Sequence, residues 1–350
     1  MFKTLAAIHL KKDKDLKLDE ISFSDPKPDE VVIKNIYAGI CHSQLINISK
    51  EPAIPDLLGH EGTAEVVKAG KKVKHVKEGD KVIVSWVPND FSNELNYLKW
   101  SSFFYKKKKY KTLIYNWSNY SKINSQFIHW LPKTNSKRLN SIMGCDVISG
   151  YLAVQKIIKK KNFNSLVLGA GGLGLLALNA LKNFKPKINI ILDKNSKKLI
   201  FAKKFGSTHS INSSLKNFEN EVLKITNNEG LDYIFDFTGN KNLQQNSLRL
   251  LKKGIPGTAN DGGTFVIVGF SYDDITFNSK NILMNNQTII GMRGGRCIPK
   301  NDFLSLFSEI KKNKIKLQEL ITDEFSLKDI NIAIKKFKKN EILGRGIIKL

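Results

Sequence analysis

Cysteine is scarce in this chain of 350 residues, which contains only Cys41, Cys145 and Cys297. The three are widely spaced and odd in number. This pattern argues against a disulfide framework and is typical of a reducing compartment. We therefore expect a cytoplasmic protein whose cysteines either pack in the core or act as thiol or metal ligands.

Long apolar runs are also missing from the sequence. No stretch approaches the roughly 20 apolar residues that a membrane-spanning helix needs, and the N-terminal residues lack the apolar segment and cleavage site of a signal peptide. We therefore expect no membrane partner. The apolar fraction of 41% and the charged fraction of 25% are those of a globular protein, and the length suffices for two domains.

Arginine is scarce as well, although the net charge is +25. The excess comes almost entirely from lysines that are spread through the chain, whereas nucleic-acid sites favour clustered arginine with interleaved aromatic residues. The one dense run, Lys106 to Lys109, is interpreted as a solvated loop. The composition therefore favours a protein with no nucleic-acid partner.

The first 85 residues are predicted to form a β-rich unit. Short β-branched runs alternate there with turn signals, and the clearest strands are Val31 to Ile36, Gly62 to Lys68 and Lys81 to Val84. Residues 86 to 125 lose this periodicity and become aromatic and lysine-rich. We interpret them as a long excursion with no predicted helix or strand.

From Asn164 onward the pattern changes to alternating strands and helices. A buried strand at Ser165 to Gly169, a helix at Leu173 to Asn183 and a strand at Ile188 to Leu192 form a βαβ unit. Further strands are expected at Tyr233 to Phe237 and Thr264 to Val268. The sequence therefore predicts an α/β fold with a doubly wound parallel sheet.

After about residue 293 the sequence pattern changes again. The C-terminal part contains two amphipathic helices, Phe303 to Lys311 and Asp329 to Lys338, and ends on a predicted strand, Gly346 to Leu350.

A glycine-rich motif stands at the turn between the strand and the helix of the βαβ unit. Gly169, Gly171 and Gly174 match G-x-G-x-x-G, and Gly172 lies within the motif. Such glycines let the backbone approach a pyrophosphate, which the helix N-terminus then binds. Together with the strands on either side, this motif predicts a dinucleotide site.

Asp193 ends the next strand, about 20 residues beyond the motif, where an acidic residue accepts hydrogen bonds from the adenosine ribose. Its carboxylate would repel a 2′-phosphate, so we expect NAD rather than NADP. Three lysines lie close by in sequence, and their positive charge would favour the 2′-phosphate of NADP. They are Lys194, Lys197 and Lys198.

Three possible metal ligands are scattered over the first 146 residues. Cys41 follows a predicted strand, His60 lies in a glycine-flanked turn, and Cys145 precedes the nucleotide unit. Two thiolates and an imidazole suit zinc and leave a fourth tetrahedral position open, as catalysis requires. Each residue alone could equally be a core or hydrogen-bonded side chain.

Taken together, these motifs resemble the zinc-containing alcohol dehydrogenases of the medium-chain dehydrogenase/reductase superfamily, over almost the whole chain. The motifs that carry the resemblance are Gly39-Ile40-Cys41-His42-Ser43, Gly59-His60-Glu61-Gly62-Thr63-Ala64, Gly144-Cys145 with Gly150-Tyr151, the glycine motif, and Gly344-Arg345-Gly346-Ile347. The resemblance implies a GroES-like catalytic domain (residues 1–146 and 293–350) and a Rossmann NAD-binding domain (residues 147–292).

For the catalytic domain, the resemblance implies one catalytic zinc held by Cys41, His60 and Cys145. Glu61 would lie close behind the zinc. Ser43 would hydrogen-bond the substrate oxygen and carry its proton away. The substrate would be a small alcohol or the matching aldehyde or ketone, and the chain would assemble as a homodimer or homotetramer.

For the cofactor, the resemblance implies several contacts outside the glycine motif. His42 and Arg345 would face the pyrophosphate of NAD, and Lys198 would join Asp193 at the adenosine ribose. Gly269, which follows the predicted strand at Thr264 to Val268, would also line the cofactor site.

The chain departs from the family pattern in three ways. Residues 86–140 contain no cysteine, so the four-cysteine lobe that commonly binds a structural zinc is absent or rebuilt, and only His129 remains there as a possible ligand. Gln44 replaces the usual aspartate that orients the ligand histidine, and its amide oxygen could do the same. Ile46 replaces the histidine that often ends the proton relay.

Two alternatives stay open at this point. A zinc-free quinone or enone reductase of the same superfamily would share the fold but lack the three ligands. A basic nucleic-acid-binding protein on a dehydrogenase fold would be of another class. The sequence does not identify the alcohol.

Overall fold

The computed structural model describes residues 1–89, 98–214, 217–271 and 273–350. The chain forms two compact units. The first unit comprises Met1–Asp146, Ile298–Ser308 and Leu317–Leu350, and the second unit comprises Val147–Cys297 and Glu309–Lys316. The sequence places the return to the first domain at residue 293, whereas residues 293–297 and 309–316 group here with the second unit.

The first unit contains two sheets, which are mostly antiparallel. The smaller sheet has the order β4-β1-β2-β7-β8. Its strands are β1 (Phe2–His9), β2 (Lys17–Phe23), β4 (Asp56–Leu57), β7 (Ser101–Tyr105) and β8 (Lys108–Thr112). The larger sheet has the order β10-β6-β5-β3-β18-β17, and β9 also pairs with β3. Its strands are β3 (Glu30–Gly39), β5 (Gly62–Ala69), β6 (Lys81–Val84), β9 (Tyr120–Asn124), β10 (Ile128–Trp130), β17 (Ile321–Ser326) and β18 (Arg345–Lys349).

The last strand, β18, brings the C-terminal end of the chain against the segment that leads to Cys41. Ile347 lies opposite Gly39 in the antiparallel register of β18 and β3, and the Ile40 amide donates to the Gly346 carbonyl at 3.2 Å. Residues about 300 positions apart in sequence are thereby adjacent. The predicted strands at Val31, Gly62, Lys81 and Gly346 correspond to β3, β5, β6 and β18.

Eight helices lie wholly or partly in the described residues of the first unit. They are α1 (His42–Ile48), η1 (Ser125–Phe127), α2 (Lys137–Asn140), η2 (Met143–Leu152), α9 (Pro299–Lys311), α10 (Leu317–Leu320), η5 (Leu327–Asp329) and α11 (Ile330–Lys338). One face of α11 buries Ile330, Ala333 and Ile334 in a core with Ile40 and Leu45. This spacing of three and four residues is the apolar stripe that predicts the helix.

The segment predicted as a long excursion without helix or strand contains a β-hairpin and the strand β9, so that prediction was wrong for residues 101–112 and 120–124. The strands β7 and β8 pair antiparallel through the two-residue turn Lys106–Lys107, in which both residues have positive φ. Tight hairpin turns of this kind usually contain Asn or Gly, and two lysines gave no such signal. The part of the excursion at residues 90–97 lies outside the described residues.

Aromatic side chains pack this segment against the smaller sheet. Phe103, Tyr115 and Trp117 are almost fully buried, whereas Trp100 is exposed. Tyr115 joins Phe103 in a core with Ile8 and Ile21. Buried aromatic side chains therefore hold part of this segment against the sheet.

The second unit is built on a parallel sheet of the order β13-β12-β11-β14-β15-β16. Its strands are β11 (Asn164–Leu168), β12 (Ile188–Asp193), β13 (His209–Asn212), β14 (Tyr233–Asp236), β15 (Thr264–Ile267) and β16 (Thr288–Gly291). Its helices are α3 (Ala153–Ile157), α4 (Gly172–Asn183), α5 (Ser196–Ala202), η3 (Lys203–Phe205), α6 (Phe218–Ile225), α7 (Lys241–Leu248), α8 (Ser279–Met284) and η4 (Arg293–Arg296).

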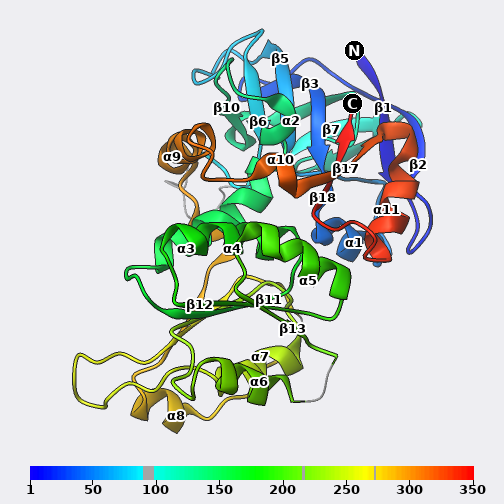
Figure 1. The fold of residues 1–350 in the computed structure, drawn as a ribbon. Helices are drawn as coiled ribbons and strands as arrows, with labels where there is room; N and C mark the ends of the chain where they lie inside the picture. The colour runs from blue at the N-terminus through cyan, green and yellow to red at the C-terminus, as the bar shows by residue number, and fades with distance from the viewer. Residues whose placement is uncertain (90–97, 215–216, 272) are drawn as a thin grey trace. The chain divides into compact units, whose positions relative to one another are not determined.

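This sheet is covered on both faces, with α4 and α5 on one side and α6 and α7 on the other (Figure 1). Strands buried on both faces are continuous apolar runs, and every residue of β11 and β14 is buried. The order is the doubly wound one that the alternating strands and helices predict. In such sheets, ligands bind at the carboxyl ends of the strands. Among the described helices, none is long and apolar enough to cross a membrane.

Candidate functional site

Cys41 lies between the end of β3 and the first turn of α1, in the first unit. It is the N-cap residue of α1, and its backbone amide donates to Gln44 Oε1 at 2.8 Å. Because β18 also holds Ile40 through a backbone bond, the position of the Cys41 thiol is fixed from two sides.

His60 and Glu61 lie in a turn between two glycines that precedes β5. Gly59 has a φ of +97°, a left-handed conformation that favours glycine. Glu61 is fully buried, and a Cβ at Gly39 would come within 2.5 Å of its carboxylate. A glycine at position 39 therefore leaves the room that Glu61 occupies.

Cys145 lies in the first turn of η2. The Ser85 hydroxyl donates to the carbonyl of Gly144 at 2.7 Å, and a Cβ at Gly144 would lie 2.2 Å from the Val84 carbonyl oxygen. The backbone at Gly144 therefore packs directly against the end of β6, which fixes the position of Cys145. Only a glycine leaves room for this contact.

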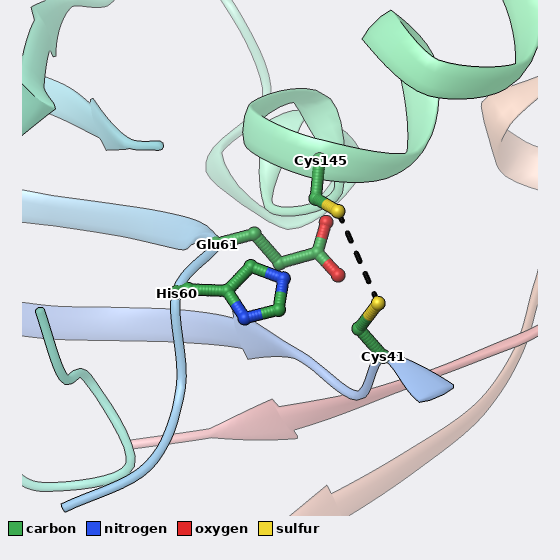
Figure 2. Close-up of side chains that lie close together, drawn as sticks. All are labelled: Cys41, His60, Glu61 and Cys145. Atoms are coloured by element: carbon green, nitrogen blue, oxygen red, sulfur yellow. Dashed lines mark hydrogen bonds between the residues drawn. The ribbon is translucent and has the colours of Figure 1, made fainter. Parts of the chain in front are cut away.

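The structure brings together Cys41, His60, Glu61 and Cys145, whose candidate ligand atoms all lie within 4.8 Å of one another. Their side chains point toward one another from three separate segments (Figure 2), and the two sulfurs are 3.9 Å apart. Two thiols and an imidazole form a donor set that suits zinc. Within the described residues, this is the one cluster with such an arrangement.

Arg345 lies beside this cluster, almost fully buried, and pairs with two carboxylates. Its Nη2 is 3.0 Å from Glu61 Oε1, and its Nε contacts Asp146 Oδ2. The predicted contact of Arg345 with the cofactor pyrophosphate stays a prediction. Asp146 is a residue that sequence reasoning missed, although it directly follows Cys145 and charged residues are rarely fully buried without a partner.

The surroundings shift the pKa values of the clustered groups. The pKa of Cys41 lies well below its usual value, chiefly because the Cys145 thiol hydrogen-bonds to it, and the pKa of Cys145 is raised by the same bond and by burial. Burial lowers the pKa of His60, but the hydrogen bond and charge of Cys41 outweigh it, so the net shift is upward.

The two carboxylic acids also have raised pKa values. Burial raises the pKa of Glu61 to about 7 and raises that of Asp146, while the charge of Arg345 opposes both shifts. Four acidic groups thus face one guanidinium. A divalent cation would compensate the negative charge that their ionisation creates.

Gln44 contacts the ring of His60 through its amide nitrogen, whereas the sequence predicted a contact through its amide oxygen. Its oxygen accepts the Cys41 amide proton, so its nitrogen Nε2 lies against His60 Nδ1. An amide nitrogen only donates hydrogen bonds. In this arrangement Nδ1 is therefore the acceptor, whereas an aspartate would accept a hydrogen bond from a protonated Nδ1.

Ser43 and His42 both lie in the first turn of α1. Ser43 Oγ is buried and has no hydrogen-bond partner among the described residues. Such an orphaned hydroxyl fits the predicted contact with a substrate oxygen. His42 is exposed and its ring packs edge-on against Phe337.

The glycine motif forms the turn from β11 to α4 in the second unit. Gly169 has a φ of +98°, and a Cβ at Gly174 would lie 1.8 Å from the Gly169 carbonyl oxygen, whereas a Cβ at Gly171 would meet nothing within 4 Å. The turn thus leaves no room for a side chain at Gly174, whereas the space beside Gly171 is open. Gly172 begins α4, so free amides of the helix N-terminus point outward from this turn.

Asp193 ends β12 beside this turn. One carboxylate oxygen accepts the Ala170 amide at 2.7 Å and the other accepts the Asn195 amide at 2.8 Å. The predicted ribose ligand is therefore also a support of the glycine turn. Lys198 is buried in α5, one turn beyond Asp193.

The carboxyl ends of β14 and β15 adjoin the same edge of the sheet. Gly269 donates its amide to the Asp236 carbonyl at 2.9 Å. The buried Asp236 carboxylate accepts bonds from Thr238, Gly239 and Gln244. Asp236 thus shapes the loop after β14, and sequence reasoning missed it because the residue carries no motif of its own.

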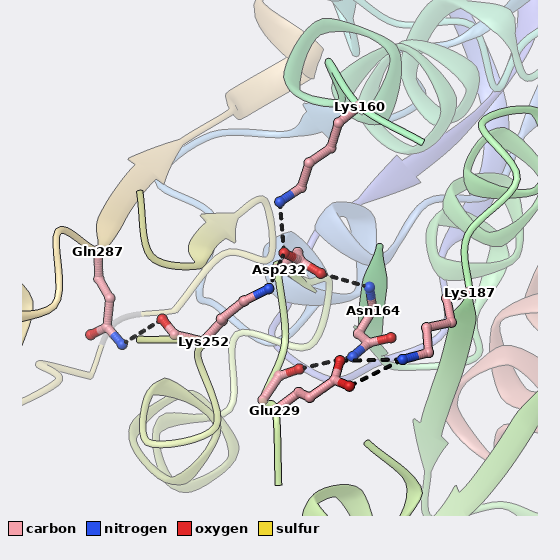
Figure 3. Close-up of polar contacts among 8 residues, drawn as sticks. Lys160, Asn164, Lys187, Glu229, Asp232, Lys252 and Gln287 are labelled. Carbon is pink, nitrogen blue, oxygen red and sulfur yellow. Dashed lines mark hydrogen bonds and ion pairs between the residues drawn. The ribbon is translucent and has the colours of Figure 1, made fainter. Parts of the chain in front are cut away.

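A second polar cluster lies at the opposite, amino-terminal edge of the sheet (Figure 3). Asp232 there accepts the Asn164 amide at 2.8 Å and pairs with Lys160 at 2.7 Å and Lys252 at 3.8 Å. An adjacent cavity of about 620 Å³ is lined partly by Lys156, Lys159 and Arg296. The paired charges and the position away from the carboxyl edge are typical of a structural role.

The chain matches two family models. Residues 27–103 match the alcohol dehydrogenase GroES-like domain, and residues 172–312 match the zinc-binding dehydrogenase domain. The fold and the cluster of cysteine and histidine define a two-domain dehydrogenase. The chain belongs to the zinc-type alcohol dehydrogenases of the medium-chain dehydrogenase/reductase superfamily, and it is an oxidoreductase.

Curated relatives match over nearly their whole length. The chain is 27% identical to a probable S-(hydroxymethyl)glutathione dehydrogenase 1 of Schizosaccharomyces pombe, over 91% of this chain and 89% of the relative. It is 27% identical to alcohol dehydrogenase 6 of Peromyscus maniculatus, over 97% and 96%. The crystal structure of benzyl alcohol dehydrogenase from Acinetobacter calcoaceticus shares the fold with a TM-score of 0.88, at 24% identity and 100% coverage of both chains.

Proposed function

We propose that this protein is a zinc-dependent dehydrogenase that transfers a hydride between an alcohol and NAD. The observation that carries the proposal is the convergence of Cys41, His60 and Cys145, with Glu61, within 4.8 Å. The soft donor set, the buried guanidinium behind it and the family membership all favour a catalytic zinc over a purely structural core.

Cys41, His60 and Cys145 would hold the zinc, and Glu61 would stay behind it, tied to Arg345. A zinc ion with three protein ligands supplies a Lewis acid that lowers the pKa of an alcohol hydroxyl. Ser43 would accept a hydrogen bond from that hydroxyl and pass its proton outward, because its own oxygen is buried and unpartnered among the described residues. Since Ile46 stands where a relay histidine is common, the proton leaves by another route.

The glycine turn and Asp193 would hold NAD, which supplies the hydride acceptor. The helix N-terminus at Gly172 favours a pyrophosphate, and the open space at Gly171 leaves room for its approach. The Asp193 carboxylate favours a ribose diol and disfavours a 2′-phosphate, which supports NAD over NADP. Lys198, Gly269, His42 and Arg345 remain the proposed further cofactor residues.

We also propose a homodimer or homotetramer. The strand β16 ends the parallel sheet, with no further strand paired to its outer edge in the described part of the chain, and the exposed apolar residues Phe277, Leu283 and Met284 lie close in sequence to it. An open edge of this kind favours pairing with another chain. The three free cysteines support a reducing, cytoplasmic location.

The decisive experiment combines metal analysis with an activity screen. Protein purified without chelators should contain one zinc per chain, and alcohols or aldehydes should change the absorbance of the nicotinamide cofactor at 340 nm. Benzyl alcohol and S-(hydroxymethyl)glutathione belong in the screen because proteins similar to this chain are named for them. A fully active metal-free protein would overturn the zinc mechanism and favour the zinc-free quinone or enone reductase.

A further inference from the structure

Two neighbouring residues, Asn116 and Trp117, lie in the segment that joins β8 to β9. Both are almost fully buried, with exposed fractions of 0% and 1%. A buried amide and a buried indole each need hydrogen-bond partners. Their partners turn out to be concentrated on the segments that carry the proposed zinc ligands.

Asn116 holds the turn that contains His60. Its Nδ2 donates to the Glu61 carbonyl at 2.7 Å, and the backbone amides of Asn116 and Trp117 both donate to the Leu58 carbonyl, at 3.2 and 3.1 Å. The carbonyls on either side of the Gly59–His60 pair are therefore bound by one dipeptide.

The two glycines of this turn are packed against the same amide. A Cβ at Gly59 would lie 2.2 Å from Asn116 Oδ1, and a Cβ at Gly62 would lie 2.4 Å from Asn116 Nδ2. No side chain at either position fits beside the amide. The glycines that flank His60 and Glu61 thus fit the shape of Asn116.

Trp117 links this turn to the segment of the second proposed ligand. Its Nε1 donates to the Gly39 carbonyl at 3.1 Å, two residues before Cys41, and its ring edge would meet a Cβ at Gly59 at 2.7 Å. The dipeptide thereby bridges the backbone before Cys41 and the backbone around His60.

We propose that Asn116 and Trp117 are positioning residues for the metal centre, and that they set the spacing between Cys41 and His60. The proposal rests on the proposed function, in that a metal binds these ligands. The dipeptide lies within residues 86–140, the region without cysteine where the family commonly has its four-cysteine lobe. Packing and four hydrogen bonds to Gly39, Leu58 and Glu61 hold the ligand segments here.

The test compares metal binding in Asn116→Asp, Asn116→Ala and Trp117→Phe with the unmodified protein. Asn116→Asp keeps the shape but loses the donor to Glu61, and Trp117→Phe keeps an aromatic ring but loses the donor to Gly39. Zinc affinity is measured by competition with a chromophoric chelator. The visible absorption bands of bound Co²⁺ report the ligand geometry independently of turnover.

We expect the Asn116 variants to bind zinc at least about tenfold more weakly, as for other residues that orient metal ligands, with shifted Co²⁺ bands and unchanged NAD affinity. Asn35→Ala is the matched control. Asn35 is also a buried amide in the first unit and donates to Ser118 and Ser121. It should lose stability while keeping wild-type zinc affinity and Co²⁺ bands.

Each outcome has a distinct meaning. Wild-type zinc affinity and Co²⁺ bands in both Asn116→Asp and Trp117→Phe would overturn the positioning role while leaving the proposed function intact. An equal loss of zinc affinity in Asn35→Ala would show that general destabilisation explains the weaker zinc binding, and this would also overturn the positioning role. Failure of the unmodified protein to bind zinc at all would instead overturn the proposed function. If Asn116→Ala does not fold, the milder Trp117→Phe still decides.

Discussion

The proposed metal centre is built in the opposite way to the proposed nucleotide turn, which is the glycine-rich turn between β11 and α4. The residues of the metal centre come from separate segments around Cys41, His60, Cys145 and Arg345, and they are ionisable and mostly buried. The nucleotide turn comes from the single βαβ segment between Asn164 and Asp193, and its functional groups are mainly backbone amides.

This difference determines how each site responds to substitution. A local turn is specified by its own residues, because glycine conformations and one helix N-terminus create it. A distributed, charged site depends on every segment that meets there, since an unpaired buried charge is strongly destabilising. Substitutions in the metal centre should therefore have larger and more strongly coupled effects than substitutions at the nucleotide turn.

The largest effect is expected for Cys145→Ala. Loss of one thiolate leaves two protein ligands, so zinc content should fall close to zero and kcat/KM should fall by about 1,000-fold or more, which corresponds to about 4 kcal/mol. NAD affinity should persist, because the turn at Gly169 does not involve the thiol. Metal analysis, turnover and titration with NAD measure the three quantities.

Cys297→Ala is the control for this experiment. Cys297 is also a buried free cysteine, but it is not part of the cluster of proposed ligands. It should retain one zinc per chain and normal turnover. Equal zinc loss in both variants would contradict the assignment of Cys145 as a ligand.

Arg345→Met tests the charge balance of the metal centre. It leaves the Glu61 and Asp146 carboxylates without their shared cation, so we expect the free energy of unfolding to fall by about 3–5 kcal/mol, as for other broken buried pairs. Urea unfolding measures this change. The partly exposed pair of Arg138 with Glu324 is the control, and Arg138→Met should lower the free energy of unfolding by about 1 kcal/mol or less.

A small effect of Arg345→Met on stability, combined with a large loss of NAD affinity, would contradict the pairing role. The cofactor would then be the main partner of Arg345.

Ser43→Ala separates proton transfer from metal binding within the same site. The hydroxyl is proposed as a proton carrier and not as a ligand, so turnover should fall about 100-fold or more while zinc content and NAD affinity stay unchanged. Steady-state kinetics with metal analysis measure both. Turnover within about twofold of the unmodified protein would show that the hydroxyl has no such role.

Gln44→Asp should strengthen the metal centre. A carboxylate could accept hydrogen bonds from both the Cys41 amide and His60 Nδ1, which leaves Nε2 free for the metal, whereas the amide nitrogen of Gln44 donates to Nδ1. We expect zinc affinity to rise about tenfold, the lower end of what such partners contribute. Gln44→Ala removes the acceptor of the Cys41 amide, which fixes the backbone at this proposed ligand, and should therefore lower zinc affinity. Unchanged affinity in both variants would contradict an orienting role for residue 44.

The same contrast explains which parts of the molecule could be predicted from the sequence. The strand, turn and helix around Gly169 follow from local patterns, and the structure places them within one or two residues of the prediction. The proposed zinc ligands were found because each lies in a short motif. Asp146 and Asn116 were missed because their roles depend on contacts between distant segments. Asp236 makes local contacts and was missed because it carries no motif of its own. The β7–β8 hairpin was missed because Lys106 and Lys107 occupy a turn where glycine or asparagine is expected.

The smallest effect is expected at the nucleotide turn, where Asp193 has two roles that two substitutions can separate. Asp193→Asn keeps an oxygen that can accept the Ala170 amide but loses the charge that favours a ribose diol. A charge-assisted hydrogen bond exceeds a neutral one by about 1 kcal/mol, so NAD affinity should fall about fivefold and the preference over NADP should shrink. Asp193→Ala also releases the Ala170 amide and should weaken both cofactors further. Fluorescence titration with NADH and NADPH, together with kcat/KM for NAD and NADP, measures these changes.

Equal use of the two cofactors by the unmodified protein would contradict the NAD assignment. Identical behaviour of the Asn and Ala variants would mean that the bond to Ala170 contributes nothing, so the turn would be held by its glycines alone.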